Sequence, residues 1–307
     1  MPSFAKSTPE DVGSCFACDA RIMETGGGLV EYAVRGQGPA LLVLHGGPGG
    51  FDQGLGLAEP FRASGFTVVA VSRPGYLGTP LETGVSCEEQ ADAMAEFVNE
   101  LGMGPLPVVA ASAGAPVGYL LAGRHPESVK ALVVIDGVSR RYDPDISFLD
   151  EAFFLSRTGL WFTAFMAQHF PATTLKSMFM TESTLDKQSI AKRVESVLAD
   201  PLKQAYFKMM FCSLDKKFKS RKQGLANDLK QLAAIDMLPL ESVSCPALVM
   251  HGAADRDVPP SHAVHAERLI PDSELYLIDE GSHLGFWLSD EAEDAQLRAV
   301  EWLSEKV

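Results

Sequence analysis

Short, mostly apolar runs recur along the chain, bounded by glycine, proline or polar residues. They span residues 41–44, 67–71, 107–110, 131–135, 247–250 and 274–278. Continuous apolar runs of this length are typical of strands buried on both faces of a parallel sheet. Upstream, residues 22–25 and 29–34 flank the turn signal Gly26-Gly27-Gly28, which predicts a hairpin. We therefore expect a mostly parallel, eight-stranded sheet with one antiparallel edge.

Segments with helical spacing separate the predicted strands. They are residues 87–101, 113–124, 261–269 and 290–306. In the last of them, Leu297, Val300 and Leu303 place apolar groups on one helix face. Alternating strands and helices predict an α/β protein with helices on both faces of the sheet.

The alternation is interrupted between Gly137 and Cys245, after the sixth predicted strand. We expect a helical cap insertion at residues 139–225, within one core domain made of residues 1–138 and 226–307. Asp186 and Pro201 are positioned to start helices in it. The insertion is rich in Phe and Met, which we expect to line a pocket or to form the cap's own core. These residues are Phe153, Phe154, Phe162, Phe165, Met166, Phe179, Met209, Met210 and Phe211.

Composition excludes several classes of protein. With 307 residues, 46% of them hydrophobic and 21% charged, the chain has enough apolar material for a core. The net charge of −14 excludes wholesale binding to nucleic acid or to anionic membranes, because such partners are held by Lys and Arg. The charge is uneven, since the predicted insertion carries 14 Lys and Arg against 9 Asp and Glu.

A basic cluster lies near the end of the insertion. Its members are Lys216, Lys217, Lys219, Arg221 and Lys222. The plain interpretation is a solvated surface that complements the acidic remainder of the chain. The sharper hypothesis is that the cluster attracts an anionic substrate.

The cysteines and the N-terminal segment point to an ordinary cytoplasmic protein. Five cysteines are too few and too scattered for a disulfide framework, and the Cys15-x-x-Cys18 pair lacks the partners of a zinc site. No cofactor or metal is implied. Residues 1–14 have no apolar signal region, so we expect a cytoplasmic location. Residues 101–123 are uncharged, but their glycines and prolines would interrupt a membrane-spanning helix.

Ser112 is the candidate nucleophile. It lies where the predicted strand at 107–110 turns into a helix, with Ala110 two residues before it and Gly114 two residues after it. This pattern is that of the nucleophile elbow G-x-S-x-G with Ala in the first position. A serine on so sharp a turn brings its neighbours close together, so their side chains must be small. The following amide, that of Ala113, is placed at a helix N-terminus.

A glycine-rich loop, His45-Gly46-Gly47-Pro48-Gly49-Gly50, follows the strand at 41–44. We expect it to offer the Gly47 amide as an oxyanion donor facing the amide of Ala113. A phosphate-binding loop is disfavoured, because the Lys-Ser/Thr pair of a P-loop and the spacing of a dinucleotide fingerprint are both missing.

A serine nucleophile needs a base, and the base needs an orienting acid. His283 follows the last predicted strand after a short loop, which makes it the candidate base. Asp255, just past the strand at 247–250, is the preferred acid over Asp257 and Asp136. The remaining histidines fit structural or solvated positions better than a catalytic one. They are His45, His125, His169, His251, His262 and His265.

Together these motifs resemble the α/β-hydrolase superfamily over nearly the whole chain. The order Ser112, Asp255, His283 matches the order of the superfamily's catalytic residues. Two departures are Ala110 in place of glycine and Ser72 in place of the aspartate frequent before the Arg-x-x-Gly turn. The matching segments are residues 45–48, 72–78, 110–114, 252–255 and 281–283.

The resemblance implies a serine hydrolase that cleaves a carboxylic ester of a small or medium apolar substrate through an acyl-enzyme on Ser112. It implies neither a nucleic-acid nor a membrane partner. The loop at 45–50 also resembles prolyl aminopeptidases, although their Gly-Gly-Ser-Trp-Gly elbow is absent. Hydrolysis of a C–C bond or an enol-lactone with the same triad stays open, as does a non-catalytic ligand-binding receptor. Haloalkane dehalogenation and epoxide hydrolysis are disfavoured, because those relatives carry Asp at the position of Ser112.

Overall fold

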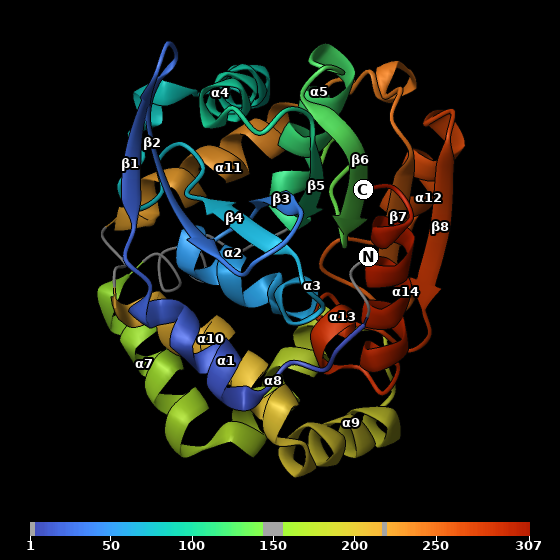
Figure 1. The fold of residues 1–307 in the computed structure, drawn as a ribbon. Helices are drawn as coiled ribbons and strands as arrows, with labels where there is room; N and C mark the ends of the chain where they lie inside the picture. Colours follow the sequence, from blue (N-terminus) through green and yellow to red (C-terminus); the bar gives the residue numbers. More distant parts are fainter. Residues whose placement is uncertain (1–3, 144–155, 217–219) are drawn as a thin grey trace.

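All predicted strands lie in a single sheet. The structure, a computed structural model, describes residues 4–143, 156–216 and 220–307. The strand order is β1-β2-β4-β3-β5-β6-β7-β8 (Figure 1). Strands β1, β2 and β4 pair antiparallel and all other neighbours pair parallel, which confirms the expected fold class. The strands are β1 (Arg21–Thr25), β2 (Gly28–Arg35), β3 (Ala40–Leu44), β4 (Thr67–Val71), β5 (Leu106–Ala111), β6 (Val129–Ile135), β7 (Ala247–Gly252) and β8 (Ser273–Ile278).

Helices connect the strands and follow β6 in a long succession. Before β6 they are α1 (Pro9–Ser14), α2 (Phe51–Leu57), α3 (Glu59–Ala63), α4 (Cys87–Leu101) and α5 (Ala115–Arg124). Between β6 and β7 they are α7 (Arg157–His169), α8 (Pro171–Glu182), α9 (Lys187–Ala199), α10 (Pro201–Lys216) and α11 (Lys222–Ala234). After β7 they are α12 (Ser261–Leu269), α13 (Gly285–Leu288) and α14 (Ala292–Ser304). Short 3₁₀ turns are η1 (Cys15–Ala17), η2 (Leu81–Thr83), η3 (Ser112–Gly114) and η5 (Leu240–Ser242).

The two faces of the sheet belong to separate apolar cores, because successive side chains of a strand point to opposite sides. In β3, Leu42 and Leu44 join the core formed with α4, α5 and α12. Leu41 and Val43 join the core formed with α2, α3 and α14, which extends to α8, α9 and α10. Burial on both faces explains why β3 to β7 are nearly continuously apolar in the sequence. The edge strand β8 is mostly exposed or half-buried, so its expected burial on both faces is wrong.

Helices α7 to α10 lie beyond the strand ends toward which the arrowheads of β6 and β8 point (Figure 1). Asp186 caps α9, where its carboxylate accepts hydrogen bonds from the amides of Gln188 and Ser189, and Pro201 is the first residue of α10. Helix α11 runs across residue 225, the predicted end of the insertion. The division into a core domain and a cap stays a prediction.

The aromatic and methionine side chains of the predicted cap have different environments. Phe179 and Met209 are buried, as expected for a cap core. Phe162 and Phe165 are instead 47% and 37% exposed, so their assignment to a core or pocket is wrong. Phe153 and Phe154 lie outside the described residues.

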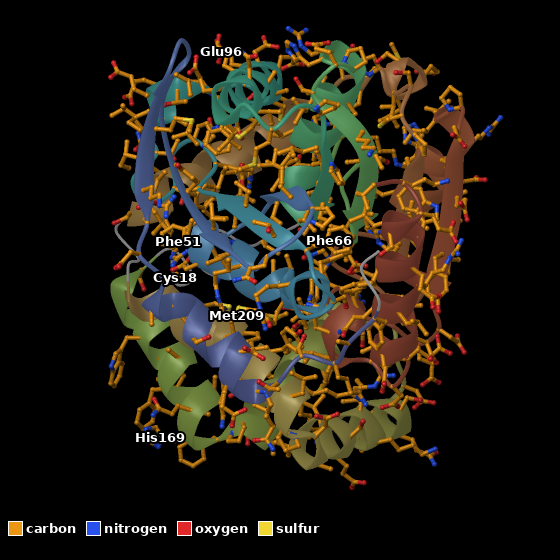
Figure 2. The ribbon with its side chains drawn as sticks, viewed as in Figure 1. Cys18, Phe51, Phe66, Glu96, His169 and Met209 are labelled. Atoms are coloured by element: carbon orange, nitrogen blue, oxygen red, sulfur yellow. The ribbon has the colours of Figure 1, made fainter. Side chains whose placement is uncertain are left out.

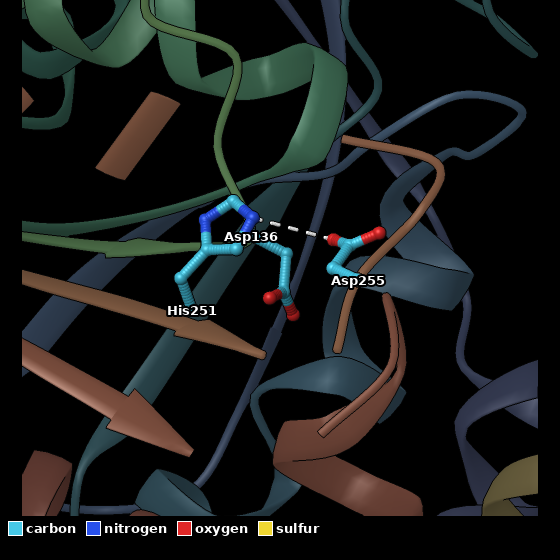
Figure 3. A group of neighbouring side chains, drawn as sticks. All are labelled: Asp136, His251 and Asp255. Atoms are coloured by element: carbon cyan, nitrogen blue, oxygen red, sulfur yellow. Dashed lines mark ion pairs between the residues drawn. The ribbon is translucent and has the colours of Figure 1, made fainter. Parts of the chain in front are cut away.

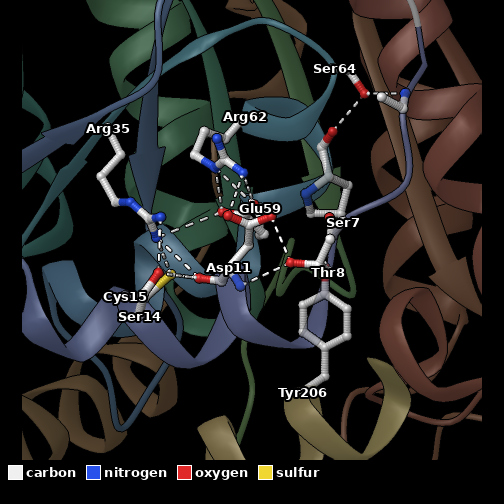
Figure 4. Close-up of polar contacts among 12 residues, drawn as sticks. Ser7, Thr8, Asp11, Ser14, Cys15, Arg35, Glu59, Arg62, Ser64 and Tyr206 are labelled. Carbon is white, nitrogen blue, oxygen red and sulfur yellow. Dashed lines mark hydrogen bonds and ion pairs between the residues drawn. The ribbon is translucent and has the colours of Figure 1, made fainter. Parts of the chain in front are cut away.

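A network of charged groups attaches α1 to the sheet (Figure 4). Arg35 of β2 donates to Cys15 Sγ at 2.9 Å and to Ser14 Oγ at 3.0 Å. Arg62 pairs with the buried Glu59 at 2.6 Å and with Asp11 at 3.0 Å. Burial raises the pKa of the Cys15 thiol to about 12, which keeps it protonated. Cys15 is thus an inert structural residue.

None of the helices in the described ranges could cross a bilayer, since each is too short or too polar. The uncharged stretch at 101–123 is divided between the end of α4, strand β5, the turn η3 and helix α5.

Candidate active site

Ser112 lies on a sharp turn between β5 and α5. Its φ of 48° is in the left-handed region, a strained conformation for a residue with a side chain. A Cβ at Gly114 would lie 2.5 Å from the His45 carbonyl oxygen and 2.7 Å from that of Leu44. Ala110 is fully buried. Close backbone packing therefore requires glycine at position 114, and Ala110 lies in the packed interior, in agreement with the elbow pattern.

The structure brings Ser112, His283 and Asp255 together. The Ser112 hydroxyl donates to Nε2 of His283 at 3.0 Å, and Nδ1–H of His283 donates to Asp255 Oδ2 at 2.7 Å. Asp255 is 2% exposed, and its second oxygen accepts the Val258 amide at 3.0 Å. Three loops at the carboxyl ends of β5, β7 and β8 thus supply one connected hydrogen-bond chain.

The two rival acids take other positions. Asp136, which follows β6, accepts the Gly252 amide through Oδ1 at 2.8 Å. Asp257 Oδ2 lies 3.7 Å from His283 Nε2, on the Ser112 side of the imidazole. Only Asp255 contacts Nδ1 among the three, so geometry favours Asp255 as the group that orients His283.

Asp255 and His283 stabilise each other's charge. Burial disfavours both ions, but the negative charge and hydrogen bond of Asp255 hold the pKa of His283 well above its ordinary value. In the same way, the neighbouring imidazoles hold the pKa of Asp255 below its ordinary value despite burial. This arrangement favours an imidazolium next to a carboxylate, the state that forms when His283 takes a proton.

A second imidazole, that of His251, lies behind Asp255. The sequence does not predict this contact. His251 is fully buried. Its Nε2 atom lies 2.7 Å from the carbonyl oxygen of Val258 and 3.3 Å from Asp255 Oδ2. Figure 3 shows the ion pair between the His251 ring and Asp255, with the Asp136 side chain next to both. Burial raises the pKa of Asp136 to about 7. The position of His251 at the end of an apolar strand suggested only a structural role.

Asp136, His251 and Asp255 each offer one atom that could bind a metal ion, and these atoms lie within 4.8 Å of one another. The Nε2 atom of His251 is directed at a backbone carbonyl, and both oxygens of Asp255 accept hydrogen bonds. Nε2 of His251 and both oxygens of Asp255 thus have partners, whereas Nδ1 of His251 and Oδ2 of Asp136 have none among the described residues.

The glycine-rich loop passes directly over Ser112. A Cβ at Gly46 would lie 2.9 Å from Ser112 Cβ, and the backbone of Gly47 borders the same cavity as Ser112. Ala113 follows Ser112 in the turn η3. The amides of Gly47 and Ala113 thus belong to segments next to Ser112, and their role as oxyanion donors stays a prediction.

A buried ion pair holds the first half of this loop. Arg73 binds Asp228 of α11 through two hydrogen bonds, at 2.9 and 2.5 Å, and Tyr76 donates to the same carboxylate at 2.6 Å. The Arg73 side chain also donates to the His45 carbonyl at 2.8 Å, and its amide donates to His45 Nε2 at 3.0 Å. His45 is therefore structural, as expected, and α11 is coupled to the loop.

A second buried ion pair holds the other half. Arg221 donates to the Gly49 carbonyl at 2.6 Å and forms two hydrogen bonds with Asp52, at 3.1 and 2.6 Å. Arg221 is 1% exposed, so its predicted place in a solvated basic cluster is wrong. Lys217 and Lys219 lie outside the described residues. The described residues give the hypothesis of an anion-attracting cluster no support.

The remaining histidines lie away from Ser112. His125 contacts Asp92 at 2.6 Å, and His262 Nδ1 accepts the Ser139 amide at 3.2 Å. His265 contacts the Ser139 hydroxyl at 3.1 Å. His169 is exposed at the outer edge of the molecule, on α7 (Figure 2). All four have the structural or solvated positions that the sequence predicts.

A cavity of about 380 Å³ opens at Ser112. Its apolar wall comes from the sheet, from α2, α10, α11 and α13, and from the loop that carries Leu284. These side chains are Leu57, Ile135, Met210, Phe211, Leu225, Leu284 and Trp287. Met210 and Phe211 thus line the pocket, as expected. Three carboxyl groups also border the cavity, from Asp136, Glu182 and Asp257.

Comparison with known proteins agrees with this fold. The family model for the alpha/beta hydrolase fold matches residues 39–290. An uncharacterized hydrolase of Bacillus subtilis, YcgS, is 30% identical over 87% of this chain and 92% of its own length. A pimeloyl-[acyl-carrier protein] methyl ester esterase of Vibrio cholerae is 27% identical over 87% of this chain and 95% of its own length.

Among solved structures, an alpha/beta hydrolase fold protein from Nakamurella multipartita superposes with a TM-score of 0.88 at 37% identity. The match covers 93% of this chain and 99% of that one. The family match spans strands β3 to β8, the serine turn, the acid loop and the histidine loop. The chain therefore belongs to the alpha/beta hydrolase fold family.

Proposed function

We propose that the protein is a carboxylic ester hydrolase that works through an acyl-enzyme on Ser112. The observation that carries this proposal is the hydrogen-bond chain from the Ser112 hydroxyl through His283 to the buried Asp255. An unperturbed serine hydroxyl is a weak nucleophile, and a neutral imidazole within hydrogen-bond distance activates it. The cavity at Ser112 gives a small or medium apolar ester room to bind.

In the proposed mechanism, Ser112 Oγ attacks the ester carbonyl while His283 Nε2 takes its proton. The Asp255 carboxylate keeps the Nδ1 proton in place and stabilises the imidazolium. The amides of Gly47 and Ala113 hold the developing oxyanion. His283 then protonates the departing alcohol, and water attacks the acyl-enzyme with His283 again as base.

Ester cleavage is favoured over the other reactions of this fold for two reasons. It needs only a nucleophile, a base, oxyanion donors and an apolar pocket, all of which have candidates at this site. In addition, a relative that aligns over most of both chains carries the name of a methyl ester esterase. We propose that helices α7 to α10 act as a cap, because Thr163 of α7 and Met210 of α10 border the cavity.

Parallel assays with p-nitrophenyl esters of short and long acids and with prolyl-naphthylamide test this proposal. We expect the esters to be hydrolysed much faster than the amide and expect turnover to be lost in Ser112→Ala. Dominant turnover of the amide would indicate a peptidase. If a folded protein hydrolyses neither the esters nor the amide, and a serine-directed phosphonate does not label it, a binding protein would be favoured.

A further inference from the structure

The cavity beside Ser112 has an unbalanced negative charge. Asp136, Glu182 and Asp257 all border it. The positive groups on its wall in the described part of the chain are Arg221 and His283. Arg221 is neutralised by its two hydrogen bonds to Asp52, and His283 is directed at Asp255. The negative groups on the wall therefore outnumber the positive ones, although Asp257 also lies within ion-pair distance of His283.

Backbone contacts fix Glu182 in this position. It is the last residue of α8, and its carbonyl accepts the amide of Arg256 at 3.0 Å. Two residues on, the Thr184 amide donates to the Ala254 carbonyl at 2.9 Å, and Ser183 forms a β-bridge with Asp255. This short antiparallel contact joins α8 to the acid loop. Within the described residues, the Glu182 carboxyl group has no hydrogen bond or ion pair of its own.

Asp257 is held on the same side of the imidazole. The Tyr142 hydroxyl donates to Asp257 Oδ1 at 2.7 Å, which leaves Oδ2 at 3.7 Å from His283 Nε2. The side chain is 44% exposed and borders the cavity. A group bound between Glu182 and Asp257 would thus lie close to the atoms that react at Ser112.

We propose that Glu182 and Asp257 form a subsite for an ammonium group of the substrate, next to the ester that Ser112 cleaves. This inference rests on the proposed ester hydrolysis and names its substrate class, esters that carry a positive charge near the scissile bond. Carboxylates at the wall of an apolar cavity attract a cation more strongly than they would in water. The Trp287 and Phe211 side chains on the wall suit the alkyl groups of such a cation.

The protonation of Glu182 supports this role. Burial raises its pKa to about 7, the charges of Asp257 and Asp255 add to the rise, and His283 opposes it. A bound ammonium group would favour the ionised carboxylate and lower this pKa. Preference for a cationic substrate should therefore grow between about pH 6 and pH 8, as Glu182 loses its proton.

Two pairs of matched esters test the proposal. The first pair is a choline ester and the 3,3-dimethylbutyl ester of the same acid, which differ in charge and hardly in shape. The second pair, ethyl glycinate and ethyl propionate, moves the charge to the acyl side. We expect the wild type to favour the charged ester of one pair by about tenfold or more in kcat/KM. We expect Glu182→Gln and Asp257→Asn each to reduce that ratio by about tenfold.

Glu195, exposed on α9 and away from the cavity wall, supplies the matched control. Glu195→Gln removes the same charge from the protein and should leave the ratio at its wild-type value. Wild-type ratios near one for both pairs would overturn the subsite, as would ratios that neither cavity variant changes. Ser112-dependent hydrolysis of the neutral esters would then still support the proposed function.

Binding measurements keep the two questions apart if no ester is turned over. Titration calorimetry would compare choline with 3,3-dimethylbutanol, and glycine ethyl ester with ethyl propionate, in the wild type and in Glu182→Gln. Tighter binding of one cation than of its neutral partner, lost in the variant, would support the subsite without the ester reaction. Equal binding within both pairs would contradict it.

Discussion

The guanidinium of Arg73 and the carboxylate of Asp228 are joined by two hydrogen bonds although they are 155 positions apart in the chain. Both side chains are nearly fully buried. The same Arg73 holds the carbonyl of His45, at the start of the loop that crosses Ser112. This pair therefore couples α11 to the predicted oxyanion loop.

Removing one charge of that pair should destabilise the protein strongly. Asp228→Asn keeps the shape of the side chain but leaves Arg73 buried without its counter-ion, which costs about 3–5 kcal/mol. Urea denaturation would measure the loss. Asp92→Asn is the control, because Asp92 pairs with Arg124 at the surface, where such pairs contribute at most about 1 kcal/mol. Equal losses in the two variants would contradict this account of the loop.

Gly114→Ala should disrupt the serine turn. The added Cβ would lie 2.5 and 2.7 Å from two backbone carbonyl oxygens, of His45 and Leu44, and neither can move without displacing β3. We expect a loss of stability of about 1–3 kcal/mol, since overpacked sites typically cost this much, and a large fall in kcat. Gly13→Ala, where no atom lies within 4 Å of the added group, serves as control. A fully active, stable Gly114→Ala variant would show that the turn is not constrained as described.

The activity should depend on pH through His283. Its base form is required, and the Asp255 carboxylate holds the pKa of His283 well above the ordinary imidazole value. Therefore kcat/KM should rise with pH, with a midpoint above about 6.5. In Asp255→Asn the midpoint should move to lower pH, and kcat should fall by about 10⁴. A midpoint at or below 6.5 in the wild type would contradict this electrostatic coupling.

The strands and the serine turn could be predicted because their signals are local. Each strand is an uninterrupted apolar run, and Ala110 and Gly114 flank Ser112 for a steric reason that acts over a few residues. His283 could be preferred over the other histidines, and Asp255 over the other aspartates, because each follows a predicted strand at the sheet's carboxyl edge. The helix predicted at 290–306 is confirmed as α14, whereas the sequence pattern does not indicate the short helix α13 before it.

The features that were missed depend on partners distant in the sequence. Arg221 lies among lysines and so looks solvated, but Asp52, 169 positions earlier, draws it into the interior. The contact of His251 with Asp255 depends on how the loop after β7 folds back. Glu182 is placed beside the site by a bridge to that same loop. Composition and periodicity carry no information about such pairings.

The central claim is that Ser112 is acylated during turnover, and mass spectrometry of the quenched protein and its peptides tests it most directly. The protein would be mixed with a p-nitrophenyl ester, quenched in acid within milliseconds and digested for peptide mapping. We predict a mass increase equal to one acyl group, confined to the peptide that contains Ser112 and absent in Ser112→Ala. Undiminished ester hydrolysis by Ser112→Ala, or an acyl group found on another residue, would contradict the account.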